Sequence, residues 1–224
     1  ALWNFNFVLK QSNKEYFIWV SSDDKLHPEF LQKNIDILEK NKNVVCSIGD
    51  VIYSDVINYE FKSNNDTKKI FRQKYVKSTY GTYESKVRTY LKFFQASMMY
   101  GLYRRDKLQK SITINKIFLA FDLSIILNVL KYGDFHVIDE NLLHRYNKGS
   151  HSIIGTLRKY DISLINIIFL ELPFTFWCLK NLGFKNFIRN FDVFLKINIV
   201  GGLTILFETI RISKRIVFRQ DMFW

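Results

Sequence analysis

The sequence of 224 residues has little cysteine, proline or glycine: two, two and nine residues. Cys46 and Cys178 are far apart in the chain, which argues against a disulfide scaffold and a cysteine-rich zinc site and fits a reducing compartment. With 48% hydrophobic and 17% aromatic residues, the composition also argues against intrinsic disorder, collagen-like repeats and low-complexity linkers. The length suffices for one large domain, or one medium domain with an appendage, around a hydrophobic core.

Acidic residues are scarce as well. The 33 Lys and Arg residues against 21 Asp and Glu residues give a net charge of +12. A surface of this charge attracts phosphates, nucleic acid or anionic lipid, and composition leaves the choice among the three open.

Several signals are missing from the chain. It starts at Ala1 without an initiator Met, a basic leader or a signal-peptide cleavage pattern. We expect either a processed start or, as the motifs below favour, the C-terminal part of a longer protein. No HExxH, GxSxG or P-loop motif occurs, which argues against a zinc protease, a serine hydrolase and a P-loop nucleotide triphosphatase.

The first half has the pattern of an α/β domain. A mixed apolar and polar stretch at residues 5–14 predicts a helix, and residues 16–20 form an apolar run without alternation, typical of a strand buried on both faces. Pro28 opens a helix with a single apolar stripe, and residues 44–48 predict a second strand, extended through Tyr53. Strand, helix and strand in this order predict a mostly parallel sheet.

The middle of the chain is basic and then returns to the sheet. Residues 62–92 hold nine Lys and Arg residues against two acidic ones, which predicts a long excursion with one short helix at residues 84–94. Residues 98–103 are expected to resume the sheet. Residues 118–130 predict a helix that ends at Gly133, and residues 135–138 predict a further strand.

The C-terminal part differs from the rest. Residues 162–179 are apolar but contain Asn166, Glu171 and Pro173, and residues 184–200 and 203–219 predict two basic amphipathic helices rich in Phe and Ile. Such helices suit either an interfacial membrane position, which we favour, or packing on the α/β domain. We therefore divide the chain into residues 1–152 and 153–224.

Three places carry charged side chains suited to chemistry. Asp23 and Asp24 follow a predicted strand, where carboxylates bind a divalent cation or simply end the strand and cap the turn. Asp122 near the start of a helix suits a general base or an ordinary capping acid. Arg145, expected in a loop after the last strand with His144, suits a phosphate site or a solvated basic loop.

The order of these features resembles family 2 glycosyltransferases with the GT-A fold. Residues 15–24 (EYFIWVSSDD) followed by Pro28 are similar to the family's "eyi-x-w-x-x-x-DD-x-x-x-p" segment, and residues 100–108 (YGLYRRDKL) to its "yGlfrr-x-x-L" element. Residues 121–133 resemble its "ED-x-x-l…l-x-x-G" helix, and residues 144–152 the following "yR-x-h…S" loop. The resemblance covers residues 5–152.

The resemblance implies a GT-A-like α/β fold and an inverting transfer of a sugar from a nucleotide-sugar donor, such as a UDP-sugar, to an acceptor hydroxyl. Asp24 would bind Mg²⁺ or Mn²⁺, Asp23 would contact the donor, and Arg145 would lie near the diphosphate. Asp122 would act as the base. The acceptor side would include Gly101 and Arg104.

The chain also departs from the family pattern. Ser22 stands where the first carboxylate of the acidic motif is usual, and Phe121 stands where the base motif has Glu. The family's donor-binding half before the acidic motif has no counterpart here, so we expect these 224 residues alone to bind nucleotide weakly and to be inactive as a hexosyltransferase.

The implied acceptor is a saccharide or a lipid-linked saccharide, and the implied location is the cytoplasmic face of the cell membrane, against an anionic lipid surface. Two alternatives from other classes stay open. One is a non-catalytic membrane-associated assembly protein. The other is a basic nucleic-acid-binding module, which we disfavour because the aromatic residues follow core patterns and no RRM, KH or helix-turn-helix signature occurs.

Overall fold

The computed structural model describes residues 2–54, 61, 71–72, 77–93, 96–112, 118–146 and 169–220. It divides into two compact units. Unit 1 contains Ala1–Asn115 and Asp122–Gly149, and unit 2 contains Lys116–Phe121 and Ser150–Trp224. The predicted boundary at residues 152 and 153 lies outside the described residues, as do residues 62–70 and 73–76 of the basic excursion.

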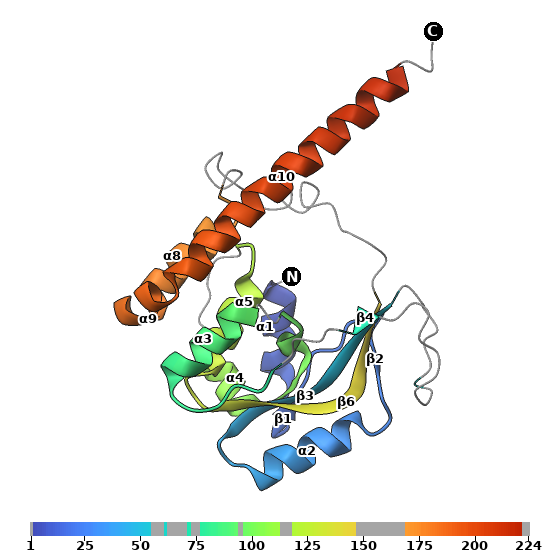
Figure 1. The fold of residues 1–224 in the computed structure, drawn as a ribbon. Coiled ribbons are helices and arrows are strands. Elements are labelled where there is room, and N and C mark those ends of the chain that lie inside the picture. The colour runs from blue at the N-terminus through green and yellow to red at the C-terminus, as the bar shows by residue number, and fades with distance from the viewer. Residues whose placement is uncertain are drawn as a thin grey trace. The chain divides into compact units, whose positions relative to one another are not determined.

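Unit 1 is built on a mixed sheet with the strand order β1-β5-β3-β6-β2, and β4 pairs with β3 (Figure 1). Its strands are β1 (Tyr16–Phe17), β2 (Lys25–Leu26), β3 (Val44–Ser54), β4 (Phe71–Arg72), β5 (Leu102–Arg104) and β6 (Asp134–Tyr146). The two long strands, β3 and β6, pair in parallel from Val44 opposite Asp134 to Ser54 opposite Tyr146. β3 is buried along almost its whole length, including the polar residues Ser47, Asp50 and Ser54.

The prediction of a mostly parallel sheet is wrong. Among the described residues, only the β3–β6 pairing is parallel, and the pairings β1–β5, β2–β6, β3–β4 and β3–β5 are antiparallel. The predicted strand at residues 16–20 is reduced to β1, which pairs with β5 and not with β3. The apolar run after β1 therefore misled the prediction, since Trp19 is buried but Val20 is 51% exposed and neither is in a strand.

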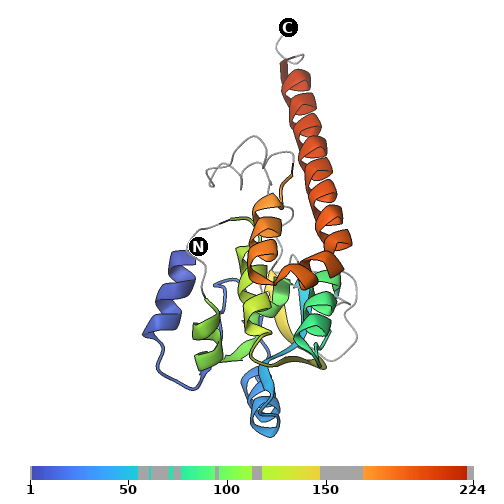
Figure 2. The ribbon, with the colours of Figure 1, turned by 90° about the vertical axis from the view of Figure 1, so that its left-hand side faces the viewer.

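Helices cover both faces of this sheet. α2 (Phe30–Lys40) lies on one face, and α1 (Leu2–Gln11), α3 (Tyr83–Phe93), α4 (Arg105–Ser111) and α5 (Phe121–Val129) lie on the other (Figure 1 and Figure 2). α2 buries Phe30, Asn34 and Leu38, one residue per turn, against β3. The buried Asn34 is satisfied there, because its Oδ1 accepts a 2.7 Å hydrogen bond from the Ser47 hydroxyl and its Nδ2 donates to the Phe30 carbonyl.

Two further predictions are corrected in unit 1. Residues 98–103 only partly join the sheet, because Ala96–Tyr100 form a 3₁₀ helix (η1) before the short strand β5. β6 continues to Tyr146, so His144 and Arg145 lie within a strand rather than in a loop after it. This extension is stabilised by pairing with β3 on one side and β2 on the other, which the local sequence does not reveal.

Unit 2 is helical, with α8 (Leu172–Asn181), α9 (Phe184–Arg189) and α10 (Phe191–Gln220). The expected break between residues 200 and 203 is wrong, because α10 continues through Gly201 and Gly202, and the break lies at Asn190 instead. Glycine is kept inside this helix by a close contact: a Cβ on Gly201 would lie 2.8 Å from Leu170 Cβ. Phe174, Phe187 and Phe194 form the aromatic centre of the unit.

Candidate functional site

Asp24 and Arg145 form an ion pair at the end of β3 and β6. Asp24 ends a turn in which its backbone N–H donates to the Ser21 carbonyl at 3.1 Å, and β2 begins at the next residue. Because Lys25 pairs with His144 across the sheet, Asp24 is carried next to Arg145. Arg145 Nε lies 3.3 Å from both carboxylate oxygens of Asp24.

The Asp24 carboxylate is buried although it lies in a turn. Its side chain is 2% exposed, and its Oδ2 atom has no hydrogen-bond partner among the described residues. Burial raises the pKa of Asp24, and the charge of Arg145 opposes this shift. A buried carboxylate oxygen that lacks a hydrogen bond is costly for stability, and such groups are concentrated at functional sites.

Arg145 is held between aromatic rings. Its guanidinium carbon lies 3.7 Å from the centroid of the Tyr100 ring and 5.9 Å from that of Tyr53, the residue opposite it on β3. Burial opposes the charge of Arg145, but Tyr100 and Asp24 outweigh burial and raise its pKa. The cation is thus fixed in position by stacking and by the ion pair.

Asp122 lies in the first turn of α5 and belongs to the same electrostatic neighbourhood. Burial raises its pKa, while the backbone N–H groups of Leu123 and Asp122 and the charge of Arg145 lower it. The pKa of Tyr100 is raised first by burial and responds to Asp24, Asp122 and Arg145 together. Asp24 and Asp122 thus each interact electrostatically with Tyr100 and with Arg145.

Tyr100 is the residue that the sequence analysis missed. It is the first residue of the segment at 100–108, but nothing in the local pattern shows that its ring will support Arg145. Just before α5, Ala120 adopts a left-handed backbone with φ of +62°, a conformation that costs a non-glycine residue about 1 kcal/mol. Strain of this kind two residues before Asp122 fixes the start of the helix that carries the carboxylate.

Asp23 is exposed and lies beside the pair. One of its oxygens accepts a short hydrogen bond from the Ser21 hydroxyl, and its charge contributes to raising the pKa of Asp24. Both predicted carboxylates of the acidic turn are thus present at one place, one exposed and one buried.

Gly101 is buried against β3. A Cβ there would lie 2.5 Å from Cys46 Sγ and 3.2 Å from the Ser47 carbonyl oxygen. The absence of a side chain at residue 101 lets the turn after η1 approach the central strand, and this packing explains the glycine without reference to an acceptor.

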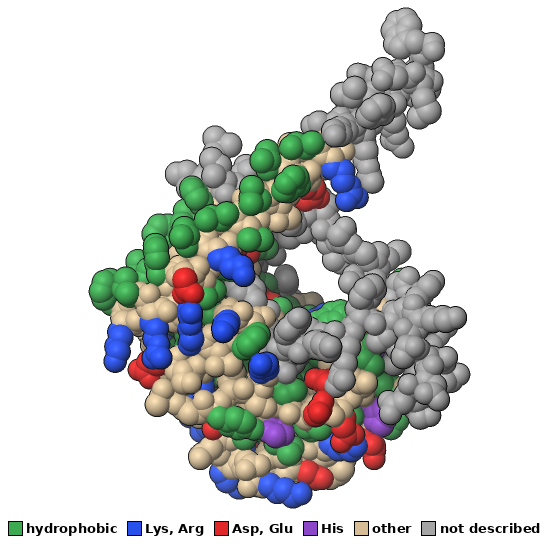
Figure 3. Space-filling view, in the orientation of Figure 1, with side chains coloured by type: hydrophobic (Ala, Val, Ile, Leu, Met, Phe, Trp, Pro, Cys, Tyr) green, Lys and Arg blue, Asp and Glu red, His purple; other side chains and the backbone are tan. Residues whose placement is uncertain are grey.

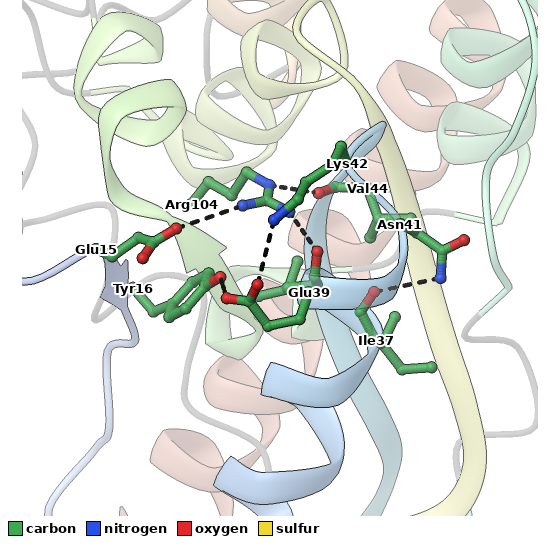
Figure 4. A network of polar contacts seen from close by, with 9 residues as sticks. Glu15, Tyr16, Ile37, Glu39, Asn41, Lys42, Val44 and Arg104 are labelled. Carbon is green, nitrogen blue, oxygen red and sulfur yellow. Dashed lines mark hydrogen bonds and ion pairs between the residues drawn. The ribbon is translucent and has the colours of Figure 1, made fainter.

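Arg104 is not brought together with Asp24 and Arg145. Its Nε donates to the carbonyl of Val44, the first residue of β3, at 3.0 Å, and its Nη2 donates to the carbonyl of Leu38 in α2 (Figure 4). Arg145 lies opposite Tyr53, nine residues further along β3, or about 30 Å at 3.3 Å per residue. Arg104 therefore joins α2, β3 and β5 at the far end of the sheet.

Arg104 belongs to a network of polar side chains that contact one another. Arg104 Nη1 lies 3.8 Å from Glu15 Oε1, and Tyr16 donates a short hydrogen bond to Glu39, which Lys42 also contacts at 3.2 Å (Figure 4). Burial, together with the bond to Glu39, raises the pKa of Tyr16 to about 12. The acceptor-side role of Gly101 and Arg104 stays a prediction, and the contacts of both residues are accounted for by packing.

The family model described as glycosyl transferase family 2 matches residues 2–112. The chain belongs to this family. No curated protein matches the chain. The match in this glycosyltransferase includes Asp24 and Tyr100 but ends before Asp122 and Arg145. Arg145 reaches Asp24 through the pairing of β2 with β6.

The residues of this glycosyltransferase fit a cation that is shared with a substrate, rather than one enclosed by protein. Within the described ranges, no group of three or more His, Cys, Asp or Glu side chains is placed to hold a metal ion. Mg²⁺ needs only one or two carboxylates when substrate phosphates and water complete its coordination. The Oδ2 atom of Asp24 and the exposed carboxylate of Asp23 provide that number.

Proposed function

We propose that the chain transfers a sugar from a nucleotide-sugar donor, of the UDP-sugar class, to a hydroxyl of a saccharide or lipid-linked acceptor, with inversion at the anomeric carbon. Family membership supports glycosyl transfer in general. The observation that carries the finer proposal is the buried Asp24 carboxylate, ion-paired with Arg145 and sharing the neighbourhood of Asp122.

On the donor side, Asp24, with Asp23 beside it, would hold Mg²⁺ or Mn²⁺. When bound, such a cation neutralises negative charge on the departing diphosphate. Arg145 contributes a fixed positive charge at the same place, because its stacking on Tyr100 leaves its guanidinium little freedom to move. Asp24 thus positions Arg145 and orients it toward the diphosphate.

On the acceptor side, Asp122 is the general base. Its raised pKa makes the carboxylate a stronger base than an exposed aspartate, while Arg145 keeps the charged form accessible. The acceptor oxygen forms a bond to the anomeric carbon, its proton passes to Asp122, and the electron pair of the broken bond leaves with the diphosphate. The proton and the electron pair are therefore taken up at opposite sides of the reacting carbon.

The test is nucleoside diphosphate release from a panel of UDP-sugars by the full chain, with Mg²⁺ or Mn²⁺ and saccharide acceptors. We expect Asp122→Asn to lower transfer by a factor of about 10² to 10⁴ and to leave metal-dependent UDP binding intact. Asp24→Asn is expected to weaken that binding. Asp106→Asn, at the exposed first turn of α4, is the matched control and is expected to change neither quantity.

A result in which Asp24→Asn and Asp122→Asn both transfer sugar as well as the unchanged chain would contradict the site. Because the 224 residues alone are expected to bind nucleotide weakly, this comparison is made on the full-length protein. Absence of transfer and of UDP binding there, with the fold intact by circular dichroism, would instead favour the non-catalytic assembly protein.

A further inference from the structure

α10 buries only one narrow side within unit 2. Phe194, Asn198, Gly201 and Ile205, spaced four, three and four residues apart, form its buried row. Asn198 Nδ2 donates a 2.8 Å hydrogen bond to the Thr175 hydroxyl of α8, and Leu170 packs against Gly201 and Ile205. Close packing through glycine and one polar contact between helices is common where helices associate in lipid.

The opposite side of α10 is apolar and exposed. Its large hydrophobic residues there are 43–68% exposed, and the band continues into α9 (Figure 3). The members of this exposed apolar band are Phe184, Ile188, Phe191, Leu195, Ile199, Val200, Leu203, Leu206, Phe207 and Ile210. A helix that faces water on this side would carry polar residues instead.

The charged residues lie on both sides of an uncharged centre of the band. Residues 197–207 contain no charged residue at all. Lys185, Arg189 and Lys196, with Asp192 among them, precede this stretch, and Glu208 and then Arg211, Lys214, Arg215 and Arg219 follow it. A helix that lies flat on a membrane has a charged face along its length, whereas charged ends around an uncharged centre are typical of a helix inserted lengthwise.

The length of the apolar stretch also fits a bilayer. Phe191–Arg211 has a mean hydropathy of 1.7 and is 28% buried in the protein, so it is not the core helix of a globular unit. Its 21 residues extend about 31 Å at 1.5 Å per residue, close to the hydrocarbon thickness of about 30 Å.

We propose that α10 inserts lengthwise into a bilayer that contains anionic phospholipid, with its exposed apolar band against the acyl chains and its basic ends in the headgroup layers. Charge complementarity selects lipid over a second copy of the chain. Residues 184–220 carry seven Lys and Arg residues against Asp192 and Glu208, so two copies that meet through this band would bring like charges together. Anionic headgroups neutralise the same residues.

The test is flotation of the full chain after cell-free synthesis in the presence of vesicles of phosphatidylcholine and phosphatidylglycerol, followed by an alkaline carbonate wash. We expect the unchanged chain to float and to resist the wash. Leu203→Asp places a charge at the centre of the band and is expected to lower the ratio of bound to unbound chain about a hundredfold. Vesicles of phosphatidylcholine alone are expected to retain less of the chain.

The matched control is Leu31→Asp on α2, since Leu31 is 47% exposed and Leu203 is 48% exposed. It is expected to float like the unchanged chain, and both variants are expected to keep their helix content in detergent. Release by carbonate would overturn lengthwise insertion in favour of a flat position. Flotation of Leu203→Asp at the unchanged level, equal binding to both kinds of vesicle, or a dimer in solution that Leu203→Asp dissociates would each overturn the proposal.

Discussion

Burial sets the protonation of the two carboxylates that lie near Arg145. It raises the pKa of both Asp24 and Asp122, and Arg145 opposes the shift at each of them. Arg145 can do so because Asp24 and the Tyr100 ring hold it in place. Burial makes such a carboxyl group a weaker acid, and the nearby cation keeps it ionisable. A carboxylate in this position is suited to accept a proton near neutral pH.

Asp122→Asn tests whether this burial destabilises the folded chain. The folded pKa of Asp122 is above its ordinary value, so between these two values the folded state holds more protons than the unfolded state. Stability contributed by the protonated form is therefore lost as pH rises through this window. Asparagine does not titrate, and we expect the variant to be the more stable protein at neutral pH, measured by urea unfolding across a pH series.

Asp106→Asn provides the control of opposite sign. Although partial burial acts against it, the contact with Lys107 lowers the pKa of Asp106, so its contribution is present at neutral pH and is lost as pH falls. That variant is expected to be slightly less stable at neutral pH. If Asp122→Asn were also less stable there, the carboxylate would be an ordinary helix-capping acid.

Among the elements, β3 joins two regions with different roles. Its first residues receive the hydrogen bond of Arg104, and its last residues lie beside Arg145 and the Ser54–His144 hydrogen bond of 2.7 Å. The parallel pairing of β3 with β6 keeps the last residues of both strands at one edge of the sheet. This is the edge at which α/β sheets place their ligands.

Arg104→Ala is expected to act through the fold. The variant leaves the Val44 and Leu38 carbonyls without a charged donor. We expect the free energy of unfolding to fall by about 1.5–3 kcal/mol for each of the two lost hydrogen bonds. Urea unfolding measures this loss. The KM for the acceptor is expected to stay unchanged in the folded protein, and a raised KM without a loss of stability would support the acceptor-side role instead.

Gly101→Ala is expected to destabilise the contact between η1 and β3 by about 1–3 kcal/mol, because its Cβ would overlap Cys46 Sγ. The double variant Gly101→Ala with Cys46→Ala removes the overlapping sulfur. We expect it to be more stable than the sum of the two single changes predicts, by thermal unfolding of all four proteins. Additive losses would show that the Ser47 and Met98 carbonyls, not Cys46, set the tight fit.

Local periodicity was sufficient to predict several elements. The helices α2 and α5 and the strand β3 are confirmed near their predicted bounds, because their apolar residues recur in the pattern of the element itself. The short helix α3 is confirmed as well, although its segment shows no sustained periodicity. The predictions of a mostly parallel sheet, of a loop at His144 and Arg145 and of a break between residues 200 and 203 were wrong. Each of these features depends on residues distant in sequence. The meeting of Asp24 with Arg145 has the same non-local origin, and the roles of the site residues stay predictions.

At the scale of the whole molecule, the chain has two cores of different composition. Unit 1 contains the sheet core, with Ile48 and Leu108 fully buried, while unit 2 depends on the aromatic cluster around Phe194. Phe194 lies 5.0 Å from Phe187 and 6.4 Å from Phe174, measured between ring centroids. A unit with its own core can lose structure without the other unit doing so.

Phe194→Ala and Ile48→Ala test this independence by hydrogen exchange in one detergent. Each removes a fully buried side chain, at a cost of about 2–5 kcal/mol within its own unit. We expect Phe194→Ala to lower the protection of amides in α8 and α10 while β3 and β6 stay protected, and Ile48→Ala to do the reverse. Loss of protection in both units from either change would mean that the sheet and the C-terminal helices unfold as one cooperative body, and membrane insertion of α10 would then bear directly on the stability of the sheet that carries Arg145.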